Sequence, residues 1–422
     1  MKSIPHQPSC TDSSEYGTVH VSDARNIILD AINPICGFEK LTIEHAIKRV
    51  LFEDVASTIN VPGHDNSAVD GFAIRFKDLN KSSEPTELKI IGTALAGSPC
   101  DQSLTPGTAI KIMTGAVLPA GTDSVLMQEH VEVLSTCIRV YRTHKLGENI
   151  RNAGEDVKKG TCVLSKGHLC CAADIGLMAS LGTHEVKVKR KPRVAILSTG
   201  DEVRRAGTIL TKGEIFDSNR YSIYAALRSY KIDITDLGIV GDNEKKISKA
   251  LSEAAEYADM IITSGGVSVG QADYTKKLLR SLGNILVEKV AIKPGRPLLF
   301  GQINGCQFFG LPGNPVAVMV TYYQFVLSAL QKLMGINPPL TTWTLTAQSL
   351  EQIRKNPGRT EIQRGILKKQ KDGSWTVRTT GRQGSGILTS VSSANAFIIL
   401  PHDRNTVEIG DTVEVQPFVG LG

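Results

Sequence analysis

The spacing of apolar positions changes several times along the chain, and each change predicts a different kind of structure. Residues 1–17 are polar and irregular, as in a frayed tail, whereas residues 22–32 repeat apolar positions on one helical face. Short apolar pieces between Gly and Pro turns fill residues 57–160 and predict a β-rich unit. Strand-like and helical segments alternate over residues 192–335, which favours a mostly parallel sheet. Beyond residue 339 strand signals return, so a small barrel or sandwich is expected there.

The C-terminal part carries two hairpin signals. Asp372-Gly373 lies between two short apolar runs, and residues 406–415 alternate in polarity around Gly410-Asp411. Both positions are expected to be turns between paired strands.

Three strand ends within residues 192–335 lead into unusual loops. The apolar run 260–262 is followed by a stretch rich in Gly, Ser and Thr. Two other predicted strands are followed by the loops 198–202 and 311–315. At the carboxyl ends of parallel strands, backbone N–H groups and helix N-termini can hold an anion, so these loops are expected to meet around one ligand. The candidate binding residues on them are Ser198, Thr199, Ser264, Gly265, Gly266, Ser268, Gly270, Pro312 and Asn314.

Carboxylates and cations adjoin these loops. Asp273 beside the glycine-rich loop would suit a phosphate with a metal ion, and the 198–202 loop adds the carboxylates of Asp201 and Glu202. Lys293 and Arg296 lie on a stiff Pro-Gly segment that can clamp an oxyanion. Each motif alone is more often an ordinary turn, a helix cap or a solvated surface. Their placement on consecutive strand–helix junctions favours a functional site.

Composition narrows the classes of function. The chain has 422 residues, a formal charge of +6, 41% hydrophobic residues and a mean hydropathy of −0.06. No apolar run approaches the roughly 20 residues that span a bilayer, and no dense Lys/Arg block is present, so neither membrane nor nucleic acid is an expected partner. The eight cysteines are scattered without a C-x-x-C pair, which indicates reduced thiols and a cytoplasmic protein.

Taken together, the motifs resemble the MoeA family of molybdopterin molybdenumtransferases, which also occurs as the E domains of plant and animal molybdenum-insertion proteins. The resemblance runs in order from about residue 20 to residue 420. The matching motifs are D-N-S-A-V-D-G-F-A at 65–73, I-M-T-G-A at 112–116, D-S-V-L-M-Q-E at 123–129, N-I-R at 149–151, G-E-D at 154–156, S-T-G-D-E at 198–202, S-G-G-V-S-V-G at 264–270 with D-Y at 273–274, K-P-G-R-P at 293–297 and L-P-G-N-P at 311–315.

The resemblance implies an α/β and β multidomain fold and an elongated homodimer. Its domains would be a discontinuous linker (18–55 and 161–190), a β-rich insert (56–160), a three-layer α/β domain similar to molybdopterin-adenylating proteins (191–340) and a C-terminal β-barrel (341–422). The family's active-site cleft lies between the α/β domain of one subunit and the insert of the other.

The implied reaction inserts molybdate into adenylylated molybdopterin and releases AMP with the help of Mg²⁺; a molybdopterin adenylyltransferase is a further expected partner. Carried over by motif, the catalytic residues would be Asp70, Thr114, Asp156, Asp242, Asp273 and Lys293. Glu202 and Asp273 would hold the metal. The anionic pterin or molybdate would be bound by Lys289, Lys293, Arg296, Arg364 and Ser385.

Two other functions stay open at this stage. A paralogue that handles tungstate would need the same anion site, because the two oxyanions are nearly isosteric. A non-catalytic scaffold of the same fold is the alternative from a different class. Intact acidic residues at Asp70, Glu202 and Asp273 favour an enzyme, because a scaffold has no need of converging carboxylates.

Overall fold

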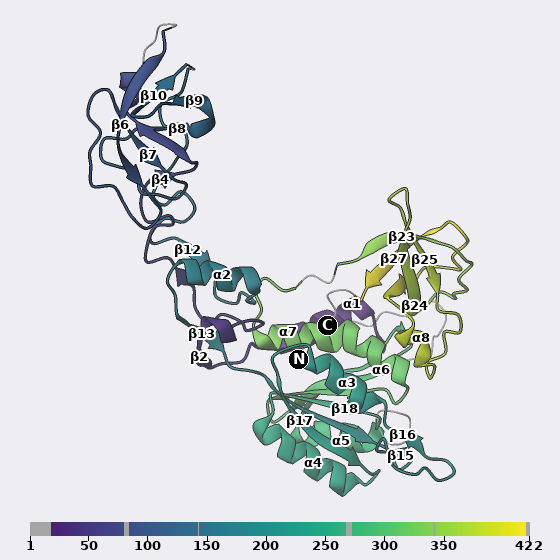
Figure 1. The fold of residues 1–422 in the computed structure, drawn as a ribbon. Coiled ribbons are helices and arrows are strands. Elements are labelled where there is room, and N and C mark those ends of the chain that lie inside the picture. Colours follow the sequence, from purple (N-terminus) through teal and green to yellow (C-terminus); the bar gives the residue numbers. More distant parts are fainter. Residues whose placement is uncertain (1–17, 80–83, 142, 267–271, 341–342, 419–422) are drawn as a thin grey trace.

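The computed structural model describes residues 18–79, 84–141, 143–266, 272–340 and 343–418, without the side chains of 272–274. Figure 1 shows an extended molecule with a β-rich unit at one end, a narrow connecting region, an α/β unit and a C-terminal β unit. The predicted tail and the candidate residues Ser268 and Gly270 lie outside the described residues.

A seven-stranded sheet forms the centre of the α/β unit in the described part of the chain. Four of its six neighbouring pairs are parallel, so the prediction of a mostly parallel sheet is confirmed. The order across the sheet is β1 (Thr18–Val19), β19 (Gly283–Val290), β21 (Pro297–Ile303), β22 (Cys306–Leu311), β18 (Met260–Ser264), β14 (Arg193–Thr199) and β17 (Asp233–Val240).

Helices cover both faces of this sheet, and its central strands β18 and β22 are buried at every position. Along β14, Val194 and Ile196 belong to one core cluster, and Ala195 and Leu197 to the other. On the first face lie α1 (Val21–Ala31), α3 (Asn219–Arg228), α6 (Pro315–Thr321), the π-helical turn η4 (Tyr322–Val326) and α7 (Leu327–Met334); on the second lie α4 (Glu244–Tyr257) and α5 (Ala272–Leu282). This three-layer unit agrees with the predicted fold class.

The β-rich unit is a six-stranded sheet with an apolar cluster on each face. Its order is β8 (Ser124–Met127), β5 (Gly71–Ile74), β7 (Thr108–Ile112), β6 (Thr86–Ala94), β10 (Cys137–Val140) and β9 (Val131–Val133), with the short pair β4 (Asn66–Ser67) and β11 (Ile150–Arg151) beside it and the turns η2 (Phe76–Asp78) and η3 (Gln128–His130).

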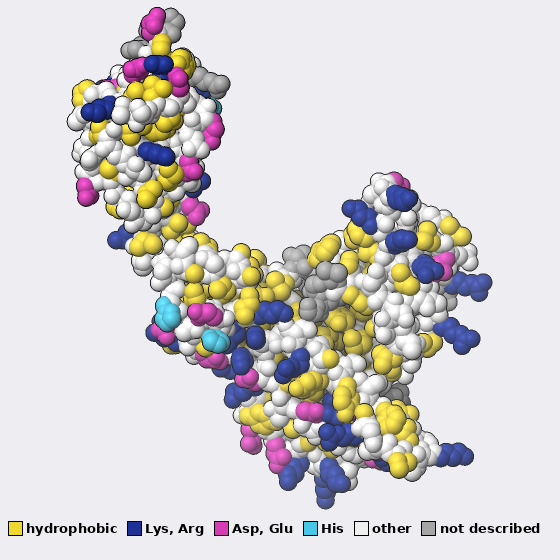
Figure 2. All heavy atoms as spheres, viewed as in Figure 1, with side chains coloured by type: hydrophobic (Ala, Val, Ile, Leu, Met, Phe, Trp, Pro, Cys, Tyr) yellow, Lys and Arg dark blue, Asp and Glu magenta, His cyan; other side chains and the backbone are white. Residues whose placement is uncertain are grey.

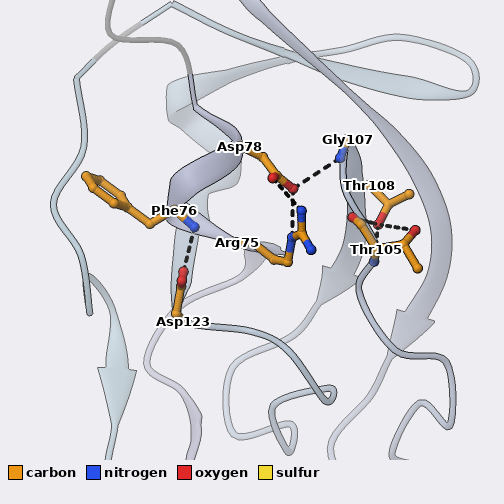
Figure 3. Close-up of polar contacts among 7 residues, drawn as sticks. All are labelled: Arg75, Phe76, Asp78, Thr105, Gly107, Thr108 and Asp123. Atoms are coloured by element: carbon orange, nitrogen blue, oxygen red, sulfur yellow. Dashed lines mark hydrogen bonds and ion pairs between the residues drawn. The ribbon is translucent and has the colours of Figure 1, made fainter.

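A polar network fastens η2 to the neighbouring loops of this unit (Figure 3). Arg75 donates to both carboxylate oxygens of Asp78 at 2.9 and 2.6 Å, and Asp78 also accepts from the Gly107 N–H at 3.1 Å. Asp123 accepts from the Phe76 N–H at 2.6 Å. The half-buried pair therefore fixes the loop that precedes β7.

The connecting region draws its core from two separate segments of the chain. Ile43 and Leu51 pack with Leu164, Met178 and Val188 in one cluster. The elements are β2 (Phe38–Thr42), η1 (Ile43–His45), β3 (Val55–Ala56), β12 (Cys162–Leu164), α2 (Ala172–Ser180) and β13 (Glu185–Lys189). Residues 18–31, in contrast, pack against the α/β sheet through β1 and α1.

The C-terminal unit closes into a barrel because β24 pairs with both β25 and β26. The sheet order is β20 (Ile292–Lys293), β24 (Thr360–Lys369), β25 (Trp375–Thr379), β23 (Leu345–Ser349), β27 (Thr412–Pro417) and β26 (Ala396–Leu400), with α8 (Thr389–Ser392) beside it. A barrel or sandwich was expected here, and the barrel is what forms.

The two predicted hairpins of this unit have different outcomes. The turn at Asp372-Gly373 joins the antiparallel strands β24 and β25, as predicted, with Gly373 in the left-handed region at a φ of 89°. The hairpin around Gly410 is wrong, since only the strand after the turn forms. Val407 instead exchanges both backbone hydrogen bonds with Ile353 at 2.9 Å, so the preceding segment has a different partner.

Candidate functional site

The three predicted loops meet because β14, β18 and β22 are parallel neighbours. The Gly265 N–H, just beyond β18, donates to the Leu311 carbonyl of β22 at 3.1 Å. On the other side, a Cβ on Gly265 would lie 2.6 Å from the Thr199 carbonyl, and one on Gly266 would lie 2.8 Å from Thr199 Oγ1. Both glycines have positive φ, 85° and 69°, so only glycine fits this turn.

Asn219, the first residue of α3, ties two of the loops together. Its Nδ2 donates to Ser264 Oγ and to the Gly313 carbonyl, both at 2.7 Å. Sequence reasoning missed this residue; the only available signal was the polar run Asp217-Ser218-Asn219 immediately before a helical pattern. Because a carbonyl oxygen accepts and never donates, the amide orientation of Asn219 is fixed by Gly313.

A buried network of hydrogen bonds and ion pairs holds the carboxyl end of β14. Ser198 Oγ donates to Asp217 at 3.0 Å, and Asp217 accepts from Arg220 Nε at 2.9 Å. Arg220 also forms an ion pair with Asp236. Ser198, Asp217 and Arg220 are all buried, so this network holds the predicted Ser198–Glu202 loop against α3.

Acidic groups gather beside this network at the same edge of the sheet. The Asp201 N–H donates to the Asp242 carboxylate at 3.2 Å, and the Asp242 N–H donates to Asp201 at 2.9 Å. Glu202 is exposed. Asp242 therefore lies beside the 198–202 loop, with Asp201 of that loop as its hydrogen-bond partner.

The carboxylates of this acidic group are suitable ligands for a magnesium ion that keeps most of its bound water molecules. No three His, Cys, Asp or Glu side chains form a metal cluster among the residues with described side chains, which do not include Asp273. Mg²⁺ is commonly bound through one or two carboxylates together with substrate phosphates, so a complete protein cage is not required. The exposed carboxylate of Glu202 at the end of a phosphate-suited loop matches that chemistry.

Arg364 is the strongest anion-binding candidate in the C-terminal unit. Its side chain is 1% exposed, and its guanidinium donates to Ser390 Oγ at 3.0 Å and to the Gly384 carbonyl at 3.2 Å. No carboxylate pairs with it among the ion pairs of the described residues, and burial lowers its pKa to about 10. A buried cation held only by neutral acceptors leaves a positive potential that favours an anion.

The remaining predicted binding residues are divided between the α/β unit and the C-terminal unit. The Ser385 carbonyl accepts from the Val316 N–H of α6 at 3.1 Å, which joins the two units. Pro312 is buried, and Asn314 is the N-cap residue of α6, although its side chain makes no cap hydrogen bond. Lys289 is half-buried on β19, Arg296 is half-buried beside it, and Lys293 is exposed.

In the β-rich unit, the candidate residues Asp70 and Thr114 are hydrogen-bonded to each other. Asp70 Oδ1 accepts from the Thr114 N–H at 2.7 Å and from Thr114 Oγ1 at 2.8 Å, and these bonds lower the pKa of Asp70. Asp156 is exposed, and its N–H donates to the Val61 carbonyl at 3.1 Å. Figure 1 places this unit at the far end of the molecule from β14, β18 and β22, so one chain does not bring the two sets of residues together.

Comparisons with known proteins agree with this architecture. Family models match along most of the chain: MoeA N-terminal region (domain I and II) at residues 19–182, "Probable molybdopterin binding domain" at 195–332 and MoeA C-terminal region (domain IV) at 346–418. The molybdopterin molybdenumtransferase of Haemophilus influenzae is 40% identical over 94% of this chain and 98% of its own length.

Two further relatives extend the comparison. Gephyrin of Dictyostelium discoideum is 32% identical over 95% of this chain and 62% of its own length. A crystal structure of the molybdopterin biosynthesis moeA protein from Pyrococcus horikoshii superimposes with a TM-score of 0.83 at 32% identity, covering 95% of this chain and all of that one.

The α/β unit with its three converging loops, set between two MoeA regions, defines a protein of molybdenum cofactor biosynthesis. The chain belongs to the MoeA family and is an enzyme of the molybdopterin molybdenumtransferase type.

Proposed function

We propose that this enzyme transfers molybdenum from molybdate to adenylylated molybdopterin and releases AMP in a Mg²⁺-dependent reaction. The observation that carries the proposal is that the chain has both an anion-suited glycine turn, Gly265-Gly266, and a buried arginine, Arg364, without an acidic partner among the described residues. A phosphate and a second oxyanion are the groups that such a site would attract.

The residues divide into roles by their chemistry. The Gly265-Gly266 turn, with Ser198, Thr199 and Ser264 beside it, would bind the adenylate phosphate, while Lys289, Lys293, Arg296, Arg364 and Ser385 would bind the dithiolene-bearing pterin and the oxyanion. Glu202 and Asp273 would hold Mg²⁺, which when bound neutralises charge on the phosphate as AMP departs. The protein contributes orientation and electrostatic stabilisation, and no covalent protein nucleophile is required.

Asp70 and Thr114 would act on the same ligand from a second copy of the chain. The hydrogen bonds from Thr114 lower the pKa of Asp70 and keep its carboxylate ionised, so it would orient an attacking group by accepting a hydrogen bond. Its distance from the α/β loops along one chain supports a homodimer in which the β-rich unit of one copy faces the α/β unit of the other (Figure 1). Asp156 and Asp242 would complete the acidic lining.

The wider assignments belong to the same proposal. The division into domains 18–55 with 161–190, 56–160, 191–340 and 341–422 is supported by the separate apolar cores, although residues 18–31 pack with the α/β sheet. The described cysteines are all free thiols, which suits the cytoplasm. A molybdopterin adenylyltransferase would supply the substrate. In the part of the chain that is described, no helix is long and apolar enough to span a membrane.

The test uses purified full-length protein with adenylylated molybdopterin, Mg²⁺ and molybdate. AMP release should depend on molybdate, and Asp273→Asn should abolish it without unfolding the protein. The matched control is Glu53→Gln, which removes a surface ion pair with Lys187 in the connecting region and should leave the rate unchanged. AMP release by Asp273→Asn at the parental rate would overturn the metal assignment.

A competition experiment separates molybdate from tungstate. Isotope-labelled molybdate and tungstate supplied together should both enter the site, with molybdate retained on the product in excess. Equal or greater retention of tungsten would instead assign the enzyme to tungsten cofactor synthesis.

A further inference from the structure

A buried carboxylate of the C-terminal barrel forms an ion pair with one of the proposed oxyanion-binding lysines. Glu361 Oε1 accepts from Lys293 Nζ at 2.9 Å, with a side-chain exposure of 7% for Glu361 and 56% for Lys293. The two residues are register partners, since β20 pairs in parallel with β24 and sets Lys293 opposite Glu361. No motif considered from the sequence contained Glu361.

The backbone beneath Lys293 is already held in place. Gly295, two residues on, has a φ of 109°, and a Cβ there would lie 2.6 Å from Thr321 Cγ2 of the α6 helix. The Thr360 N–H donates to the Ala291 carbonyl at 2.9 Å, which locks the start of β24 to the same turn. What remains free is the four-carbon side chain of Lys293, and the contact with Glu361 fixes it.

Polar and charged groups surround Glu361. Its second oxygen accepts from Gln363 Nε2 at 3.3 Å. Lys355, 4% exposed, donates to the carbonyls of Asn356, His402 and Arg404 at 3.2, 3.3 and 2.9 Å. Burial lowers the pKa of Lys355, and the charges of Glu361 and Asp403 oppose that effect. The carboxylate of Glu361 therefore lies in the field of two ammonium groups, and only that of Lys293 forms an ion pair with it among the described residues.

We infer that Glu361 is a positioning residue for the oxyanion step, holding the Lys293 ammonium in place before molybdate arrives. An ammonium group has three N–H donors, and the bond to Glu361 uses one of them, which leaves two for an oxyanion. Fixing a long side chain in advance removes part of the entropy lost on binding. This inference rests on the proposed function, because it assigns Lys293 to the oxyanion.

The test measures AMP release against molybdate concentration for Glu361→Gln, which keeps the shape and loses the charge. The KM for molybdate should rise about fivefold, as expected when one charge-assisted hydrogen bond stops orienting the lysine. The kcat at saturating molybdate and the KM for adenylylated molybdopterin should stay unchanged. Glu361→Asp, with its carboxylate one methylene shorter, should show a smaller rise in the same constant.

A double-mutant cycle distinguishes positioning from general support of the barrel. In a Lys293→Met background, Glu361→Gln should add no further rise in the molybdate KM, because it acts through the lysine. Additive effects, a fall in kcat alone, or no effect of Glu361→Gln in an active enzyme would each overturn the inference and leave the proposed function standing. If the parental enzyme shows no molybdate-dependent AMP release, the proposed function fails first.

Discussion

The hydrogen bonds of Asn219 give the sharpest structural prediction. Asn219→Ala removes both 2.7 Å bonds, to Ser264 Oγ and to the Gly313 carbonyl. Asn219→Asp has the same shape but presents an acceptor to the Gly313 carbonyl, so attraction becomes repulsion. The aspartate is therefore expected to harm the site more than the alanine, although it is the closer match in size.

The magnitudes follow from the two contacts. A typical hydrogen bond contributes about 1 kcal/mol net, so Asn219→Ala should lower the local opening free energy by about 2 kcal/mol. Asn219→Asp adds a poorly compensated charge, and its cost should reach about 3–4 kcal/mol. The helix N-terminus returns only a part of this, about 0.3–1 kcal/mol.

Amide hydrogen exchange at Gly265 reports this opening directly, because its N–H bonds to the Leu311 carbonyl. Protection should fall about 30-fold in Asn219→Ala and more in Asn219→Asp. Asn243→Ala, which removes the N-cap of α4, is the control and should leave Gly265 unchanged. Equal protection in the two Asn219 variants, or better protection in the aspartate, would refute the reasoning.

Three further predictions concern stability and activity. Burial raises the pKa of Asp259, but two 2.7 Å bonds from Arg190 help to bring it below its ordinary value. The stabilisation by the ionised Asp259 is thus present above its unfolded pKa of about 3.9 and is lost as pH falls through the lower folded value. The Tm of Asp259→Asn should therefore lie below that of the parental protein at pH 7, and the difference should shrink near pH 3. A Tm difference independent of pH would contradict this. Gly265→Ala should slow AMP release at least about tenfold, since its Cβ would lie 2.6 Å from the Thr199 carbonyl; a parental rate would show that the turn has room. Arg364→Met should lose molybdate-dependent AMP release while its Tm in a thermal melt stays equal or rises, because an uncompensated buried charge is removed; retained activity would show that Arg364 does not hold the anion.

The helices and strands could be predicted from the sequence where the local spacing of apolar residues determines them. The apolar runs of β14 and β18 and the helical spacing of α4 appear as expected, and parallel pairing then brings the three loops together. The barrel was recognised from its turns, but the strand before Gly410 was not, because Val407 finds Ile353 as its partner across more than fifty residues of chain.

The missed residues share one physical cause. Asn219, Asp217 and Glu361 act through contacts with segments far along the chain, and no periodicity records such contacts. Lys293 was found from its Pro-Gly setting, whereas its partner lies 68 positions later on a different unit. Local chemistry identifies loops that can bind, and tertiary pairing decides which side chains hold them in place.

The central claim is that each active site combines the α/β loops of one copy with the β-rich unit of another, and mixing two inactive variants tests it directly. Asp70→Asn disables the β-rich unit, and Asp273→Asn disables the α/β loops. A homodimer of either variant should therefore be inactive. In a randomly re-associated 1:1 mixture half of the dimers are mixed and each has one intact site, which predicts about a quarter of the parental AMP release. No recovery in a mixture shown to contain mixed dimers would contradict the account.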